Sequence, residues 1–281
     1  MRTLRRALVL GSGGLTGLAW EVGVLEGLAD AGLDLASDLV VGTSAGALAG
    51  ARLTSGWTLA ELAAILLQPG LDPGPLAPTR TRRSFLLPLL AAQLHLDRQR
   101  ALAWLGRRAA SDWTAERESA WVGAVSGDLA GRPWPASLAV VATDATSGRP
   151  VLLDARHPAD LAAAVAATCA LPGVYPAVRI GDRLLFDGGL RSPANLDVAG
   201  SAEVVLALAP LTGAIRAHRR PGVQAARLRA VGTRVVLLTP DVAGRRTIGL
   251  DVLAAGRVPA ALEAGRALGA HRAAAVQAAW S

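Results

Sequence analysis

The stretch LVVGTSAGALAGARL, residues 39–53, decides the fold, because it joins an apolar run to a helical pattern through a serine between two glycines. Its first three residues are apolar, as in a buried strand, and residues 47–53 have a helical composition. Gly42 and Gly46 each lie two positions from Ser44, the spacing of a GxSxG turn. Such a turn tolerates little side-chain volume and presents the serine hydroxyl above the sheet edge. The stretch therefore predicts an α/β protein with Ser44 as a candidate nucleophile.

The composition predicts one domain, residues 1–281, with a core of small aliphatic side chains. Hydrophobic residues make up 52% of the chain and aromatic residues only 4%, so Ala, Leu and Val must fill the core. The single cysteine, Cys169, excludes an internal disulfide. Its alanine-rich surroundings predict a small buried hydrophobe in a helix.

The net charge of +7 comes wholly from arginine, because the sequence contains no lysine. A basic surface attracts phosphate groups, which nucleic acids and anionic lipid head groups both present. The sequence has no nucleic-acid-binding motif and no aromatic RNA-binding signature, so we expect no nucleic-acid partner. The lipid alternative stays open.

Apolar strand-like runs alternate with helical stretches along the chain. Continuous Val and Leu runs indicate strands buried on both faces, and strand–helix alternation indicates a mainly parallel sheet covered by helices on either side. The predicted strands are residues 5–10, 38–41, 137–143, 203–209 and 234–239.

Residues 71–135 differ in composition from the rest of the chain and predict a mostly helical, cap-like insertion. They contain four of the seven tryptophans and nine arginines, and no clear strand of a parallel sheet. Arg80, Arg82 and Arg83 precede the apolar residues 85–92, a pattern typical of an interfacial segment and equally of a helical hairpin buried on the sheet.

No continuous apolar stretch reaches the length of about 18 residues that a membrane-spanning helix needs. The apolar part of residues 1–10 is too short for a signal peptide. We expect a cytoplasmic protein, with peripheral membrane contact as the alternative.

A glycine-rich turn at residues 11–17 follows the first predicted strand and begins a helical run at residues 18–30. The backbone amides of Gly13 and Gly14 carry no side chains and lie at a helix N-terminus, where they can bind an anionic oxygen. A phosphate and a catalytic oxyanion fit equally well. A dinucleotide fingerprint would place a glycine where Thr16 stands, so that motif is incomplete.

A third cluster, Asp187-Gly188-Gly189, follows a hairpin-like pattern at residues 178–185. An aspartate at a strand end beside two glycines is well placed to act as a base, and it is also what an ordinary Asp-Gly turn contains.

The three clusters, in this order and spacing, closely resemble the patatin-like phospholipase family. Further matching segments follow the first cluster, follow a middle strand and precede the aspartate. The matching segments are residues 12–17, 20–28, 42–46, 142–148, 170–176 and 187–189.

The resemblance implies a three-layer α/β/α sandwich and a serine acyl-ester hydrolase that acts on a lipid or ester without cofactor or metal. Ser44 would be the nucleophile, Asp187 its base, and Gly13 and Gly14 the oxyanion hole. The other motif residues are Ser12, Gly17, Gly42, Gly46, Gly188 and Gly189. The first turn departs from the family, which usually begins it with glycine instead of Ser12 and carries a basic residue instead of Thr16.

Three alternatives compete with this hypothesis. A Ser–Asp–His triad is formally available with His218 or His271, but Arg219 and Arg220 would disfavour a protonated His218. A nucleotide- or phosphate-binding protein would need only the first glycine turn. A catalytically degenerate, lipid-binding homologue would account for Ser12 and Thr16, the two departures from the family in that turn. The histidines and the single cysteine show no metal-ligand spacing.

Overall fold

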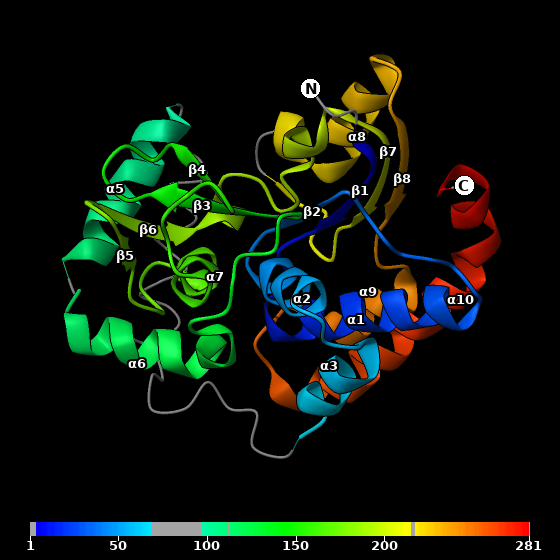
Figure 1. Ribbon diagram of the computed structural model, residues 1–281, viewed down its shortest axis with the longest axis horizontal. Coiled ribbons are helices and arrows are strands. Elements are labelled where there is room, and N and C mark those ends of the chain that lie inside the picture. The colour runs from blue at the N-terminus through cyan, green and yellow to red at the C-terminus, as the bar shows by residue number, and fades with distance from the viewer. Residues whose placement is uncertain (1–3, 69–96, 112, 215–216, 281) are drawn as a thin grey trace.

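The computed structural model describes residues 4–68, 97–111, 113–214 and 217–280, and its centre is a mixed sheet (Figure 1). Within these residues eight strands form the sheet, seven of them in the order β5-β6-β3-β2-β1-β7-β8, with β4 also paired to β3. Five strands run parallel to one another: β1 (Leu4–Leu10), β2 (Leu39–Gly42), β3 (Leu138–Asp144), β7 (Ala202–Leu208) and β8 (Arg234–Leu238). The five strands expected from the sequence are therefore confirmed.

Antiparallel strands extend the sheet beyond β3. The hairpin of β5 (Val178–Ile180) and β6 (Arg183–Asp187) adds to one side of β3, and β4 (Pro150–Asp154) also pairs with β3. In this register Asp187, the last residue of β6, lies opposite Ala142 of β3. The hairpin thus carries the candidate base to the strand next to β2.

Helices cover both faces of the sheet, so the predicted three-layer α/β/α class is confirmed. In Figure 1, α5 and α8 lie on one side of the sheet and α1, α2, α7 and α10 on the other. The bounds on the first side are α5 (Arg98–Ala110), α8 (Pro221–Ala230) and the short helix η4 (Leu196–Ala199). Those on the second are α1 (Gly14–Asp30), α2 (Ala45–Thr54), α3 (Leu59–Leu66), α6 (Ala115–Ser126), α7 (Leu161–Cys169), α9 (Val242–Ile248) and α10 (Val258–Trp280).

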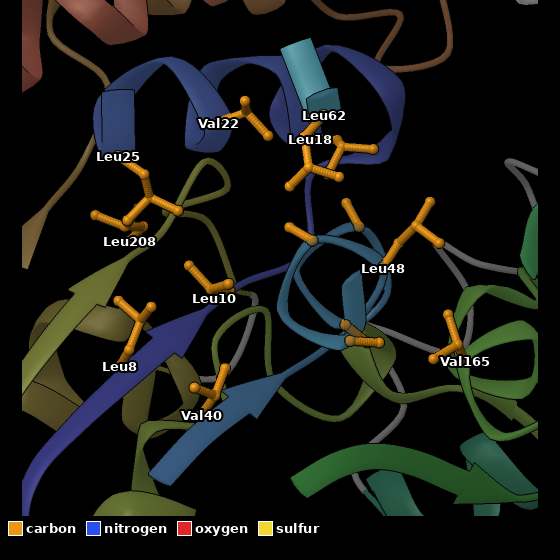
Figure 2. Close-up of a cluster of buried hydrophobic side chains, with 14 of the residues drawn as sticks. Leu8, Leu10, Leu18, Val22, Leu25, Val40, Leu48, Leu62, Val165 and Leu208 are labelled. Carbon is orange, nitrogen blue, oxygen red and sulfur yellow. The ribbon is translucent and has the colours of Figure 1, made fainter. Parts of the chain in front are cut away.

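The larger core lies between the sheet and the layer that contains α1. Alternate residues of a strand point to opposite faces, so Leu8 and Leu10 of β1 enter this core while Ala7 and Val9 face η4 and α8. Figure 2 shows the aliphatic side chains that meet here from β1, β2 and β7 and from the covering helices, among them Leu8, Leu10, Leu18, Val22, Leu25, Val40, Leu48, Leu62, Val165 and Leu208.

Close packing of α1 on α10 holds the first glycine turn in position. A Cβ added to Gly23 of α1 would lie 2.0 Å from the backbone oxygen of Leu262 in α10. One added to Gly27 would lie 2.1 Å from the backbone oxygen of Arg266. Only glycine permits this approach, and the resulting contact fixes the axis of α1. The N-terminus of α1 is thereby held at the edge of the sheet.

The described part of the expected insertion, residues 97–111 and 113–135, consists of α5, α6 and the short helix η2 (Gly127–Leu129), without a strand. Leu102 and Leu105 of α5 pack against Phe186 and Leu190, which lie one residue before and three residues after Asp187. The apolar segment 85–92 and the three arginines before it lie outside the described residues. Among the residues described, no helix is both long and apolar enough to cross a membrane.

Candidate active site

Ser44 occupies a strained turn between β2 and α2. Its backbone angles are φ 53° and ψ −121°, a conformation that non-glycine residues rarely adopt and that concentrates at functional sites. Gly42 and Gly46 lie against backbone, because an added Cβ would stand 2.4 Å from Ala47 Cα and 2.2 Å from Leu10 O respectively. Close packing on both sides therefore keeps Ser44 in this conformation.

A threonine from a distant helix braces this turn. The Ser44 amide donates to Thr168 Oγ1 at 2.9 Å, and the Thr168 hydroxyl donates in turn to Val141 O of β3 at 2.6 Å. Thr168 is fully buried near the end of α7. The strained serine is thus tied to β3 through a side chain that the sequence analysis did not single out.

Asp187 lies beside Ser44 although 143 positions separate them in the sequence. Its carboxyl accepts a hydrogen bond from the Gly189 amide at 2.6 Å, and the Ser44 hydroxyl lies close enough to favour the ionised form of that carboxyl. Burial raises the pKa of Asp187 to about 6, and the Gly189 amide and the nearby Ser44 hydroxyl oppose that rise. The carboxyl is therefore largely ionised at neutral pH and close to the point at which it takes up a proton.

The thiol of Cys169 also faces this pair. Burial together with the nearby Asp187 carboxyl raises the pKa of the thiol, and the nearby Ser44 side chain opposes that rise. The neutral thiol is a weak nucleophile and a weak hydrogen-bonding group. Cys169 is thus part of the wall around Ser44, in addition to the packing role that its alanine-rich context predicts.

The first glycine turn places two backbone amides at the start of α1. Gly13 is the N-cap and Gly14, with φ +58°, is the first helical residue. No acceptor within the described residues binds either amide. The turn is joined to the Ser44 turn, because the Gly46 amide donates to Gly11 O at 3.0 Å. Two unpaired amides at a helix N-terminus favour an anionic oxygen.

A family profile named patatin-like phospholipase matches residues 8–199, which contain both turns and Asp187. The chain belongs to the patatin-like phospholipase family.

Curated relatives support this patatin-like assignment. An uncharacterized NTE family protein of Mycobacterium bovis is 32% identical over 206 residues, which cover 73% of this chain and 48% of the relative. Uncharacterized NTE family proteins of two Mycobacterium tuberculosis strains match to the same extent. The chain spans about half the length of these curated relatives.

Two solved structures align with most of the chain. VipD from Legionella pneumophila aligns over 97% of this chain and 67% of its own, with a TM-score of 0.48 and 12% identity. The type III effector protein ExoU aligns over 96% and 53%, with a TM-score of 0.41 and 17% identity.

This patatin-like chain anchors its first turn to a segment near the C-terminus. The Thr16 hydroxyl, where the family usually carries a basic residue, donates to Ile248 O at 3.2 Å and Val252 O at 3.3 Å. The Thr16 amide also donates to Val252 O, at 3.0 Å. Thr16 is fully buried, so this position makes a structural contact and adds no charge to the site.

Glu21 supports the same turn from within α1. Its Oε1 accepts from the Gly11 amide at 2.7 Å, and burial raises the pKa of Glu21 well above its ordinary value. The carboxyl is fully buried, and this burial disfavours its charged form. Gly17, one turn along α1, leaves room for Pro210, whose Cβ would lie 3.0 Å from an added Cβ.

Asn195 links the two sides of the site. Its Nδ2 donates to Thr43 Oγ1 in the Ser44 turn at 3.0 Å and to Gly188 O in the Asp187 turn at 3.4 Å. The residue has φ 47°, in the left-handed region that asparagine tolerates better than most residues. Gly188 is closely packed, because an added Cβ would lie 2.0 Å from Val141 O. The sequence alone gave no signal for this bridging amide.

The candidate histidines belong to elements other than the turns that contain Ser44 and Asp187. His271 is exposed on α10, and His218 belongs to the short helix η5 (Ala217–Arg219) that precedes α8. The Asp187 carboxyl instead accepts from the Gly189 amide, and the nearby Ser44 hydroxyl favours its ionised form. No group of three or more His, Cys, Asp or Glu residues that could hold a metal occurs among the described residues.

Proposed function

We propose that this chain is a serine hydrolase that cleaves the acyl ester of a lipid through a Ser44–Asp187 dyad. The observation that carries the proposal is the Ser44 hydroxyl close to a buried carboxyl whose ionised form it favours, together with two amides at the start of α1 that no described residue binds. Acyl transfer needs a nucleophile, a base and an oxyanion site that lie close together.

In the first half of the reaction, Ser44 Oγ attacks the ester carbonyl carbon and its proton passes to Asp187. The pKa of about 6 suits this step, because the carboxylate is ionised near neutral pH and still basic enough to accept a proton. Negative charge develops on the carbonyl oxygen, where the amides of Gly13 and Gly14 bind it. Asp187 then gives the proton to the departing alcohol, which leaves an acyl ester on Ser44.

In the second half, water attacks the acyl ester while Asp187 accepts one of its protons. The bond between the acyl carbon and Ser44 Oγ breaks, Ser44 recovers the proton, and the carboxylic acid leaves. The same amides bind the oxyanion in both halves, so the site needs no histidine and no metal for this cycle.

A lipid is the proposed substrate class because of the family to which the chain belongs and the charge it carries. The family profile is that of patatin-like phospholipases, and the net charge of +7 favours contact with anionic head groups. Phospholipid, lysophospholipid and simple carboxylic ester contain the same reacting bond, so all three belong in the test.

The test compares hydrolysis of a short-chain p-nitrophenyl ester and of phospholipid vesicles by the wild type, Ser44→Ala and Asp187→Asn. We expect each substitution to lower kcat/KM by at least about 1,000-fold, because nucleophile and base act as a unit. A fluorophosphonate probe should label wild-type Ser44 and leave Ser44→Ala unlabelled. Equal hydrolysis by all three proteins would refute the dyad.

Asp144→Asn is the matched control for Asp187→Asn. Asp144 is also a buried aspartate at a strand end, and it caps its own turn by accepting from the amides of Thr146 and Ser147. Loss of activity in both aspartate variants would attribute the effect to turn structure instead of base catalysis. Vesicle binding by a well-folded wild type that shows neither turnover nor probe labelling would support the degenerate lipid-binding alternative.

A further inference from the structure

Ser12 contributes a buried hydroxyl that no residue of the described chain satisfies. The residue is 7% exposed, and its Oγ has no hydrogen-bond partner within residues 4–68, 97–111, 113–214 and 217–280. The backbone is fixed, because the Ser12 amide donates to Pro193 O at 2.7 Å. Buried polar atoms in proteins are normally hydrogen-bonded, so this unsatisfied hydroxyl calls for an explanation, which its surroundings must supply.

The Ser12 hydroxyl lies on the Asp187 side of the site. A Cβ built on Gly189 would stand 2.1 Å from Ser12 Oγ and 2.9 Å from Asp187 Oδ1, so both oxygens approach the same bare Cα. The Gly189 amide already donates to Asp187 Oδ1 at 2.6 Å. Gly189 therefore allows an unpaired hydroxyl and the proposed base to border one small region.

A side chain that borders this region can contact the same attacking oxygen that Asp187 deprotonates. The oxyanion develops on the carbonyl oxygen, which faces the amides of Gly13 and Gly14. The attacking oxygen, in contrast, must be within hydrogen-bond reach of Asp187 to lose its proton. Before acylation this oxygen is Ser44 Oγ, and after acylation it belongs to a water molecule.

We propose that Ser12 orients the water that hydrolyses the acyl-enzyme, an inference that rests on the proposed Ser44–Asp187 function. Once Ser44 Oγ is esterified it no longer donates to Asp187, and water takes over that donation. One O–H of the water points to the Asp187 carboxylate and the other to Ser12 Oγ, which leaves a lone pair directed at the acyl carbon.

The step balances without any further reactant. A bond forms between the water oxygen and the acyl carbon, one proton passes from water to Asp187, and the bond from the acyl carbon to Ser44 Oγ breaks. Ser44 takes that proton back, and the second proton leaves with the carboxylic acid. Ser12 gains and loses no atoms, so it is a water-binding residue with an effect confined to deacylation.

The test is the steady-state kinetics of Ser12→Ala with an activated p-nitrophenyl ester. Acylation by such an ester is fast, so kcat reports deacylation while kcat/KM reports acylation. We expect kcat and KM to fall together by about fivefold to tenfold, the effect of one lost hydrogen bond, with kcat/KM within about twofold of wild type. The fraction of Ser44 that carries the acyl group, measured by acid quench and mass spectrometry at a substrate concentration well below the wild-type KM, should rise.

Ser55→Ala is the matched control. Ser55 follows α2 at the end opposite Ser44, and its Oγ is likewise buried without a partner among the described residues. Its removal should leave kcat, KM and the acylated fraction as in wild type. Ser12→Gly, which restores the residue usual in the family, serves as the second variant and carries the test if Ser12→Ala loses its cooperative thermal transition.

Two results would overturn the inference. Unchanged kcat and acylated fraction in both Ser12 variants would show that the hydroxyl is idle, and a parallel fall of kcat and kcat/KM would place it in acylation or in structure. Failure of the proposed function looks different, because fluorophosphonate would then leave wild-type Ser44 unlabelled and no acylated Ser44 would form in any of the proteins.

Discussion

Two neighbouring strand-to-helix turns, residues 11–17 after β1 and residues 42–46 after β2, differ in the residue that takes the left-handed backbone. In the first it is Gly14, with φ +58°, and in the second it is Ser44, with φ 53°. Because β1 and β2 are parallel neighbours, both turns lie at the same edge of the sheet. The glycine leaves backbone amides uncovered, whereas the serine presents a hydroxyl.

A strand-to-helix turn with a positive φ can thus supply either the nucleophile or the oxyanion donors of an acyl-transfer site. The glycine adopts a positive φ at little cost, but the serine requires support from its surroundings. That support comes from Thr168 of α7, which binds the Ser44 amide at 2.9 Å. The first turn is instead fixed through Thr16, which reaches outward to Ile248 and Val252.

Gly14→Ala changes the first turn directly and should have the largest effect on kcat/KM. An added Cβ would stand 2.7 Å from Val252 O in a left-handed conformation, so the turn must shift. Displacing one oxyanion donor typically costs about 100-fold to 1,000-fold in rate, and we expect kcat/KM for a p-nitrophenyl ester to fall by that factor.

Gly181→Ala separates this effect from backbone strain. Gly181 has φ +61° in the turn between β5 and β6, and an added Cβ there would meet nothing within 4 Å. Strain alone should lower the free energy of unfolding by about 1 kcal/mol and leave kcat/KM unchanged. A folded Gly14→Ala variant with wild-type activity would remove the first turn from the mechanism.

The pH profile should reveal Asp187, because neither turn contains a titratable side chain. The base acts in its ionised form, and burial raises its pKa to about 6. We therefore expect kcat/KM to level off above about pH 7 and to fall about tenfold per unit below the pKa. The neighbouring Cys169 stays neutral in this range, because its pKa is raised. A flat profile down to pH 4 would contradict the assignment of the base.

The same shift makes a stability prediction. A carboxyl whose pKa rises on folding opposes folding progressively as pH rises from 3.8 to about 6. Asp187→Asn removes that cost, so its free energy of unfolding in urea should exceed that of the wild type at pH 8 by about 1–3 kcal/mol. The advantage should shrink when both proteins are compared near pH 4.

Thr168→Val tests the support of the second turn and should lower kcat/KM by about tenfold. The substitution keeps the shape but leaves the Ser44 amide and Val141 O without the hydroxyl that joins them, at a cost of about 1–3 kcal/mol for each buried group. Both kcat/KM and urea unfolding would be measured. Thr168→Ser retains the hydroxyl and should stay near wild type; equal losses in both variants would indicate packing instead.

The sequence predicted the parallel core because its signals are local. Continuous apolar runs mark β1, β2, β3, β7 and β8, and the hairpin pattern marks β5 and β6. β4 was missed, because its five residues, PVLLD, show no alternation of apolar and polar side chains and it forms through antiparallel pairing with β3. The GxSxG spacing likewise pointed to Ser44, because the glycine requirement is steric and short-range.

The contacts around Ser44 were less accessible, because they join distant parts of the chain. Thr168 binds an amide 124 positions away, and Asn195 binds Thr43 across 152 positions. Their residue types are common in turns and helices, so nothing local distinguishes them. Cys169 is similar: its alanine-rich context predicts packing, while its thiol also faces Ser44.

Thr16→Val should have the smallest effect and would sharpen the contrast between the two turns. It removes the donations to Ile248 O and Val252 O, but the Thr16 amide still donates to Val252 O at 3.0 Å, so only part of the anchor is lost. We expect a loss of about 1 kcal/mol in the free energy of unfolding and kcat/KM within about twofold of wild type. Thr16→Ser, which keeps the hydroxyl, is the control. A fall in kcat/KM as large as that of Thr168→Val would mean that the glycine turn, too, depends on support from a threonine hydroxyl, and the proposed difference between the two turns would disappear.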